Sequence, residues 1–262
     1  MEFYIFSNNI DEVKELIDHN YSGALLIYNT DLSDFFTQVA RTMNVGESFK
    51  YMVAVRPYAI SPQYLCMINN SINNINEDRL EINLISGWAK EDEKKSGGIL
   101  GDVNDSSSKI DKSNYLIEYI DVLEKYDKKV PDYYVSVADK SMVSETLKHN
   151  SKLLINYPDY VEKSYDISNR DVMVYLWVAL RETEEELDIL RKKNSEEHYK
   201  YYRLQYFTYQ QFNDILIELT NKGIKKILLY AYWDEKEKKI INNFVKKYKE
   251  KEIIWKIFYC QH

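Results

Sequence analysis

Eight short apolar segments alternate with segments of helical periodicity, and this alternation limits the folds open to the chain. The apolar segments, which we expect to be strands, cover residues 3–6, 24–28, 51–55, 79–85, 133–137, 152–155, 172–180 and 226–230. The helical segments cover residues 10–20, 33–43, 61 onward, 112–126, 140–149, 182–201, 209–221 and 235–249. Ser61 followed by Pro62 is typical of a helix start, with Ser as N-cap and Pro in the first turn.

Eight strands alternating with helices favour a (β/α)8 barrel over an open doubly wound sheet. A weak internal repeat agrees with this interpretation, since residues 21–28 resemble residues 222–230 and residues 152–157 are a fainter copy. The 262 residues fit one large α/β domain or two small ones. Because the alternation runs through the whole chain, we expect a single barrel domain over residues 1–262.

The composition excludes several classes of protein. A net charge of −7 argues against a nucleic acid or an anionic membrane as partner. The longest apolar run, residues 172–180, is too short to cross a bilayer, and the N-terminal residues lack the features of a secretion signal. Two cysteines, Cys66 and Cys260, do not make a disulfide framework. We therefore expect a cytoplasmic protein.

Residues 87–110 interrupt the alternation. They are polar and glycine-rich and have no period, which predicts a mobile surface loop. The loop follows the fourth expected strand, at the face of a barrel where enzymes build their active sites. A disordered insertion and a lid over a ligand are both compatible with this pattern.

The residues that usually perform catalysis without a cofactor form no recognisable pattern. No histidine stands near another His, Cys or Glu at the spacing of metal ligands, which argues against a metal site. The sequence has no nucleophile elbow and no Walker loop, and residues 97–101 lack the spacing of a dinucleotide-binding turn. If the protein is an enzyme, we expect a cofactor to carry the chemistry.

The most specific motif lies in residues 51–63, which read YMVAVRPYAISPQ, and residues 76–87, which read NEDRLEINLISG. It resembles the bacterial luciferase-like monooxygenases, most closely the alkanesulfonate monooxygenase branch. In that family a third strand ending V-A-x-R-P, an S-P helix start, a (D)RLSNGR turn and an N-L-V-T-G strand follow in this order. Residues 23–34, 180–183 and 223–232 resemble the family around strands two, seven and eight. The family is usually longer, so we expect shortened insertions.

The resemblance implies a (β/α)8 barrel that is often dimeric. It also implies reduced FMN, supplied by a separate flavin reductase, and oxygen activation as a flavin peroxide; some relatives use the deazaflavin F420 instead. On this basis we expect a flavin-dependent monooxygenase that acts on a small organic substrate, as a homodimer or a heterodimer. The expected dimer face consists of residues 33–43 and 61–76, with Phe35, Phe36, Met43 and Met67 exposed.

Matching positions imply which residues contact the cofactor. Val55 and Arg56, at the end of the third strand, are expected along the flavin ring. Asn83 and Ser86, at the end of the fourth strand, would offer polar contacts to the flavin, and Ser136 would lie near its phosphate or ribityl chain. The structural alternatives are a cap of a buried loop for Asn83 and a core ion pair for Arg56.

Two further positions follow from the resemblance. Tyr232 matches a family tyrosine beside the active site and is the expected catalytic residue, assisting proton transfer or orienting the peroxide. Lys109 stands where the family has the Arg of an S-x-R-Y motif and is expected to keep a cation at the cofactor. A lysine does not replace the bidentate contacts of an arginine.

The substrate side departs from the sulfonate enzymes. Leu32 stands in place of their strand-two cysteine, and Tyr175 and Trp177 stand in place of their strand-seven Arg and His. With Tyr28, these residues are the expected substrate pocket, apolar or aromatic rather than anion-binding. The alternative for Trp177 is a place in the barrel core.

Three functions stay open at this point. The first is a reduced-flavin monooxygenase whose substrate is not a small alkanesulfonate. The second is a degenerate barrel that binds flavin or another ligand without oxygenase chemistry, which the loss of polar residues favours. The third is a non-catalytic partner subunit. Fold analogy alone does not decide between them.

Overall fold

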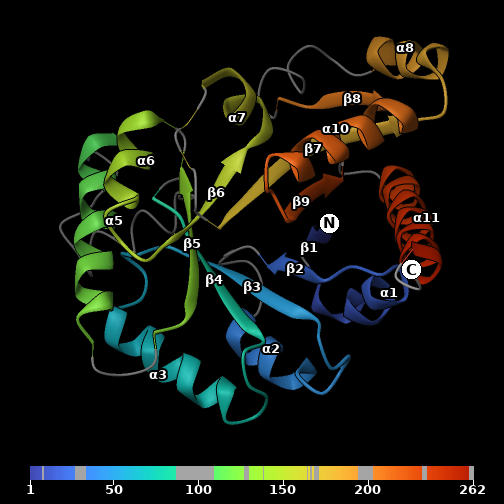
Figure 1. Ribbon diagram of the computed structural model, residues 1–262. Helices are drawn as coiled ribbons and strands as arrows, with labels where there is room; N and C mark the ends of the chain where they lie inside the picture. Colours follow the sequence, from blue (N-terminus) through green and yellow to red (C-terminus); the bar gives the residue numbers. More distant parts are fainter. Residues whose placement is uncertain are drawn as a thin grey trace.

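The computed structural model describes residues 1–7, 9–26, 34–86, 109–126, 130–137, 139–163, 165, 167, 171–193, 203–231 and 235–259, and for residues 109–111 and 253–259 only the backbone. These residues form one parallel sheet surrounded by helices (Figure 1). The strands are β1 (Glu2–Ser7), β2 (Gly23–Leu26), β3 (Lys50–Val55), β4 (Leu80–Leu84), β5 (Asp132–Val137), β6 (Lys152–Asn156), β7 (Val172–Arg181), β8 (Gln205–Thr208) and β9 (Lys226–Ala231).

Eight of these strands close into a barrel. The ring runs β1 to β7 in chain order, then β9, which pairs back to β1, and every pairing is parallel. Parallel strands joined by helices are the arrangement of a (β/α)8 barrel. The predicted fold class is therefore confirmed, and the eight ring strands coincide with the eight predicted segments to within a few residues.

The helices lie around the barrel (Figure 1). They are η1 (Ile10–Glu12), α1 (Val13–Asp18), α2 (Phe35–Thr42), α3 (Pro62–Asn73), α5 (Lys109–Glu124), α6 (Lys140–Thr146), α7 (Tyr157–Lys163), α8 (Glu184–Lys193), α10 (Tyr209–Asn221) and α11 (Glu235–Tyr259). The predicted start of α3 is confirmed, because the Ser61 hydroxyl accepts a hydrogen bond of 3.2 Å from the Tyr64 amide and Pro62 follows the cap.

Three features differ from the sequence expectations. The short strand β8 and the helix α7 were not predicted; α7 follows β6 without an intervening residue, and β8 becomes a strand only by pairing with the end of β7. The predicted helix over residues 182–201 is limited to α8 among the residues that the structure describes. The predicted loop over residues 87–110 ends too late, since Lys109 and Ile110 already belong to α5; residues 87–108 lie outside the described ranges.

Two apolar clusters build the core. The larger one fills the space between the strands and the helices, and the smaller one fills the barrel lumen with Tyr4, Leu25, Met52, Tyr134, Leu154, Met173 and Leu228 among others. Gly23 shows how closely the lumen is packed, because a Cβ at this position would lie 2.4 Å from the Tyr4 ring and 2.7 Å from the Lys50 carbonyl oxygen. Only glycine lets Tyr4 lie across β2.

Charged side chains close the lumen at the amino ends of the strands, a group that we call the barrel floor. Lys226 of β9 donates hydrogen bonds to Glu81 Oε1 (3.2 Å) and to the Tyr134 hydroxyl (2.8 Å). Since β9 and β4 lie four strands apart in either direction, the Lys226–Glu81 pair crosses the lumen. Lys152 of β6 lies beside this pair and contacts Asp132 at 2.8 Å.

At the other end, β7 continues beyond the barrel. Val178 is the last residue of β7 that pairs with β9, and it is also the first that pairs with β8. The extension carries a small core of its own, formed by Ala179, Leu187, Leu190, Leu204 and Tyr206, with α8 packed on it. Arg181, the last residue of β7, makes a bidentate ion pair with the buried Glu237 of α11, which ties the extension to the barrel.

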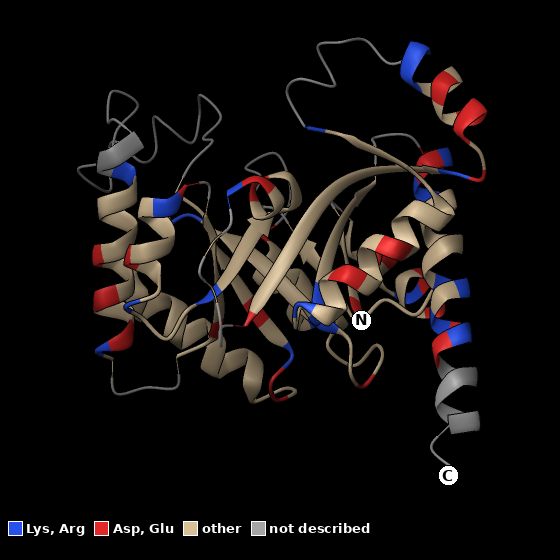
Figure 2. Cartoon of the chain, turned by 45° about the horizontal axis from the view of Figure 1, so that its top comes forward, with Lys and Arg blue, Asp and Glu red and all other residues tan. Residues whose placement is uncertain are grey.

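Charged residues gather on the outer helices, while most positions along the strands are uncharged (Figure 2). The predicted solvated faces of α8 and α11 agree with this distribution. In the part of the chain that the structure describes, we find no helix with the length and apolar character needed to span a membrane.

Candidate functional site at the carboxyl end of the barrel

The uppermost layer of lumen side chains differs from the layers beneath it. Phe6, Ile85, Tyr175 and Tyr230 belong to the lumen cluster and are only partly buried, whereas the lumen residues below them are at most 2% exposed. Solvent therefore reaches the lumen at the carboxyl ends of the strands, which we call the barrel mouth. This is the face on which (β/α)8 enzymes place their active sites.

Aromatic rings line the mouth along β7, β9 and β1. The Tyr230 ring stacks on Trp177 (centroids 4.4 Å, interplanar angle 26°) and on Phe6 (4.7 Å, 24°). Trp177 and Tyr230 are direct register partners, and Phe6 and Tyr230 follow the Ile5–Leu229 pair along their strands. The centroid distances match the spacing of about 4.8 Å between neighbouring strands. We call this row of rings the aromatic ladder; Tyr175 lies 5.8 Å from Tyr230 at its side.

Small and polar side chains occupy the opposite part of the mouth, along β3 to β6. Ala54 pairs with Asn83, and the Ser136 hydroxyl donates a hydrogen bond of 2.9 Å to Asn83 Oδ1. This bond fixes the amide so that the Nδ2 protons are the donors which Asn83 offers to a ligand. Asn156, at the end of β6, pairs with Tyr175 and joins the polar part to the aromatic part.

The two tyrosines of the mouth stay uncharged at neutral pH. Burial raises the pKa of Tyr175 to about 12; the Asp159 carboxylate adds to this effect and the Arg203 guanidinium opposes it. Burial also raises the pKa of Tyr230, with a smaller contribution from Tyr175. Both phenols can donate a hydrogen bond but do not act as anionic bases.

A charged cluster lies next to Tyr175. The buried Asp159 of α7 accepts a hydrogen bond of 2.8 Å from Arg203 and pairs with Lys163 at 2.9 Å. Arg203 also contacts Glu162 at 3.0 Å and adopts a left-handed backbone conformation (φ 52°). Two cations and two carboxylates balance one another here, so the cluster holds α7 against the residues before β8.

The structure brings part of the expected cofactor residues together. Asn83 and Ser136 are in contact, and Ser86 lies two residues beyond the end of β4 and is partly exposed. Arg56 follows β3 directly and is 6% exposed. The Val55 side chain packs in the outer cluster between the strands and the helices, so only its backbone faces the lumen side.

The other expected site residues divide into two groups. Tyr175 and Trp177 both contact the Tyr230 ring at the mouth, and their place in a substrate pocket stays a prediction. Lys109 is the first residue of α5, and its side chain is not described. The catalytic candidate Tyr232 and the pocket candidates Tyr28 and Leu32 lie outside the described residues.

Sequence reasoning missed Phe6, Asn156 and Tyr230 as members of the mouth. One signal was present: each is among the last two residues of its strand and has the same parity as a lumen residue two positions earlier, such as Tyr4 before Phe6 and Leu228 before Tyr230. Among the residues that the structure describes, no group of three or more His, Cys, Asp or Glu side chains is placed to hold a metal ion.

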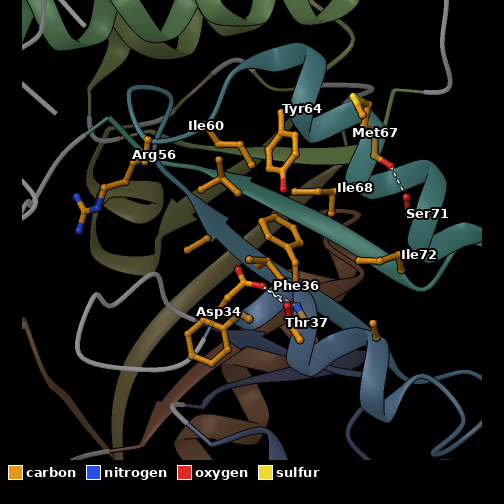
Figure 3. Close-up of a pocket in the computed structure, with 16 residues that line it drawn as sticks. Asp34, Phe36, Thr37, Arg56, Ile60, Tyr64, Met67, Ile68, Ser71 and Ile72 are labelled. Carbon is orange, nitrogen blue, oxygen red and sulfur yellow. Dashed lines mark hydrogen bonds between the residues drawn. The ribbon is translucent and has the colours of Figure 1, made fainter. Parts of the chain in front are cut away.

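A groove lies between α2 and α3, next to the carboxyl end of β3, and its lining includes Ala54, Val55 and Arg56 (Figure 3). This groove has a volume of about 700 Å³ and a mostly apolar lining that includes Phe36, Ile60, Tyr64, Met67 and Ile68. Tyr64 and Met67 are 56% and 48% exposed. The expected dimer face is wrong in one respect, which concerns Phe35 and Met43.

Phe35 and Met43 are buried in the outer cluster, at 5% and 0% exposure, and not on the surface. The cause is the phase of α2: Phe35 and Val39, four residues apart, both turn inward. Phe36 is turned toward the groove instead (Figure 3).

No protein-family model matches the sequence, and no curated protein matches it. Solved structures do match the fold. The long-chain alkane monooxygenase LadA superposes with a TM-score of 0.68 at 10% identity, covering 96% of this chain and 91% of LadA. The riboflavin lyase RcaE, solved with modified FMN and riboflavin, gives a TM-score of 0.67 at 7% identity, covering 96% of this chain and 92% of RcaE.

An F420-dependent secondary alcohol dehydrogenase, solved with an F420–acetone adduct, gives a TM-score of 0.64 at 10% identity, covering 95% of this chain and 97% of the dehydrogenase. Identities this low show a shared fold alone. The chain thus shares the (β/α)8 barrel fold of these three enzymes, with a partly exposed mouth that is aromatic on one side and polar on the other.

Proposed function

We propose that the protein is a reduced-flavin-dependent monooxygenase that acts on a small organic substrate. The observation that carries the proposal is the divided mouth, where the Asn83–Ser136 pair faces the aromatic ladder across the lumen of a luciferase-like barrel. A flavin needs hydrogen-bond donors at its ring carbonyls, and its reaction with oxygen needs walls that exclude water. The mouth offers both kinds of surface.

The residues at the polar side fit a flavin ring. Asn83 Nδ2 and the Ser86 hydroxyl are donors, and the flavin carbonyls are acceptors. Ala54, with its small side chain, leaves room between them. When bound, the reduced flavin would supply the electrons that activate oxygen for transfer of one oxygen atom to the substrate.

The chain's own residues have separate tasks in this proposal. Asn83, held by Ser136, orients the ring through its amide protons. The aromatic ladder keeps water from the reacting atoms. We assign proton transfer to Tyr232 because of its match to the family tyrosine.

FMN, supplied by a separate flavin reductase, is the first cofactor to test, and F420 is the second. One structural neighbour was solved with FMN and another with F420. The polar side of the mouth does not discriminate between the two ring systems, since both carry the carbonyls that Asn83 would contact.

The decisive experiment is a titration of the purified protein with oxidised and with anaerobically reduced FMN, followed by calorimetry. We expect micromolar binding that favours the reduced form. A flavin reductase is then added, and oxygen uptake is recorded with a panel of apolar substrates. Binding without substrate-dependent oxygen uptake would instead indicate a flavin-binding barrel without oxygenase activity. If neither FMN nor F420 binds to the protein, the function that remains is that of a non-catalytic partner subunit.

Matched variants locate the binding site. Asn83→Ala is expected to weaken reduced-FMN binding about fivefold, since a net hydrogen bond contributes about 1 kcal/mol. Val135→Ala is the control, because this buried side chain belongs to the outer cluster and no flavin contact is proposed for it, and the affinity of this variant should stay within twofold of the parent. Equal effects of the two variants would contradict a flavin at the polar side of the mouth.

We also propose that two copies of the chain associate through the α2–α3 groove as a homodimer. An apolar groove with exposed Tyr64 and Met67 is typical of a surface that is covered in an assembly. Light scattering after size exclusion should give twice the chain mass, and Met67→Lys should give the monomer. Ile189→Lys on α8, which is 68% exposed, introduces the same charge elsewhere and should leave the dimer intact.

A further inference from the structure

The aromatic ladder has a geometry that suits a particular kind of ligand. Its rings come from three neighbouring strands and stack along the direction in which the strands neighbour one another. Each ring therefore covers the face of the next one. Tyr230 is covered on both faces, by Trp177 and by Phe6.

Each end of the ladder has apolar neighbours. Trp177 packs against the small core of the β7 extension, which contains Ala179, Leu187 and Tyr206. Phe6 pairs in register with Leu25 of β2, which is 1% exposed. Since both faces of Tyr230 are occupied, the exposure that this ring retains belongs mainly to its edges.

Ring edges carry partial positive charge, and they attract the electron-rich face of another aromatic ring in an edge-to-face contact. An aliphatic ligand would also bury apolar area against the ladder, but it would lack this electrostatic attraction to the ring edges. An anionic ligand would have to give up its water, because both mouth tyrosines are neutral and the cations Arg203 and Lys163 are already paired with Asp159.

From these observations we propose that the barrel mouth binds an uncharged, planar aromatic substrate, whose ring face lies against the edges of the Phe6–Tyr230–Trp177 ladder. Calling this ligand a substrate rests on the proposed function. The inference extends that function by naming the chemical class of the substrate. The binding itself requires no flavin, because the ladder is held by strand register and by its own packing.

The test uses three probes of similar size: 2-naphthol, its saturated analogue decahydro-2-naphthol, and the anion 2-naphthoate. Ligand-observed NMR and calorimetry at pH 7 measure their binding to the full chain without flavin. We expect 2-naphthol to bind below 1 mM, the saturated analogue about fivefold more weakly and the anion at least tenfold more weakly. The fivefold figure follows from about 1 kcal/mol for an edge-to-face aromatic contact.

Variants separate the ladder from other apolar surfaces. Trp177→Leu should remove most of the preference for 2-naphthol over its saturated analogue, and Phe6→Leu does the same should the tryptophan variant not fold. Tyr230→Phe keeps the ring and should keep the preference. If Met67→Ala in the α2–α3 groove abolishes binding and Trp177→Leu does not, the ligand lies in the groove and the proposal is wrong.

Other outcomes also decide the matter. No binding of 2-naphthol at 1 mM, or equal binding of the saturated analogue, overturns the inference. Reduced-FMN binding is measured on the same samples, so the two proposals fail separately. Flavin binding without 2-naphthol binding refutes the substrate class alone, and 2-naphthol binding without flavin binding refutes the monooxygenase alone.

Discussion

At the floor of the barrel, the lumen is closed by a charged pair that is hydrogen-bonded to the Tyr134 hydroxyl; at the mouth, it is lined by stacked rings and a neutral polar pair. The floor is dry, with Glu81 only 3% and Lys226 only 15% exposed as side chains. The mouth rings, by contrast, keep part of their surface accessible. Both groups sit on the same strands, one at each end.

The difference separates stability from function within one lumen. A buried charge is costly without its partner, so the floor residues depend strictly on one another. The mouth residues are neutral, and each keeps neighbours when another is changed. Substitutions at the floor should therefore act on folding, and substitutions at the mouth should act mainly on ligands. The following predictions test this division, from the largest expected effect to the smallest.

Glu81→Leu should destabilise the protein most, by about 4 kcal/mol, because it removes the carboxylate partner of Lys226 and leaves this ammonium with the neutral Tyr134 hydroxyl and the neighbouring aromatic rings. Urea unfolding measures the change. The double variant Glu81→Leu with Lys226→Met removes both charges and should be more stable than Glu81→Leu alone. If the double variant is the less stable of the two, the floor does not act as a coupled pair.

Arg181→Met should cost about 3 kcal/mol, since Glu237 is 4% exposed as a side chain and would lose a bidentate partner. This pair lies near the mouth. The variant therefore tests whether loss of the partner of a buried charge costs as much stability there as it does at the floor. Urea unfolding is again the measurement, with Arg191→Met as the control because its ion pairs are exposed. Equal losses in the two variants would contradict the importance of burial.

Trp177→Leu should cost only about 1–2 kcal/mol, because the ring is partly exposed and leucine keeps some of its contacts. The same variant should change the ligand preference described above. A loss of 4 kcal/mol or more would place Trp177 with the floor residues and would argue that the ladder serves folding rather than binding.

The pH dependence should be the smallest effect across the physiological range. Because the pKa of Tyr175 is raised from 10.0 to about 12, its contribution to stability is fully present below pH 10 and is lost as the pH rises toward 12. The tyrosine contribution to ligand affinity should therefore be flat between pH 6 and 9. Calorimetry of 2-naphthol with the parent and Tyr175→Phe checks this. A difference between the two that changes over this range would mean that the Tyr175 phenol ionises there.

The strands and their order could be predicted because each one carries enough local information. Residues 51–55 and 226–230 are apolar runs of strand length, and Ser61 with Pro62 marks a helix start by capping alone. The positions of Asn83 and Ser136 at the ends of their strands could be predicted for the same reason. β8 could not be found, since its four residues become a strand only by pairing with the β7 extension.

The sequence by itself determined the alternation of eight strands and helices, and with it a parallel barrel whose strand ends carry Asn83, Ser136, Tyr175 and Trp177. Only the tertiary structure decided that Phe6, Trp177 and Tyr230 stack in one row, and that Lys226 meets Glu81 across the lumen. The physical reason is that these contacts depend on strand register and on closure of the ring. Both are set by pairings between residues as far apart as Phe3 and Ile227, which local periodicity does not encode.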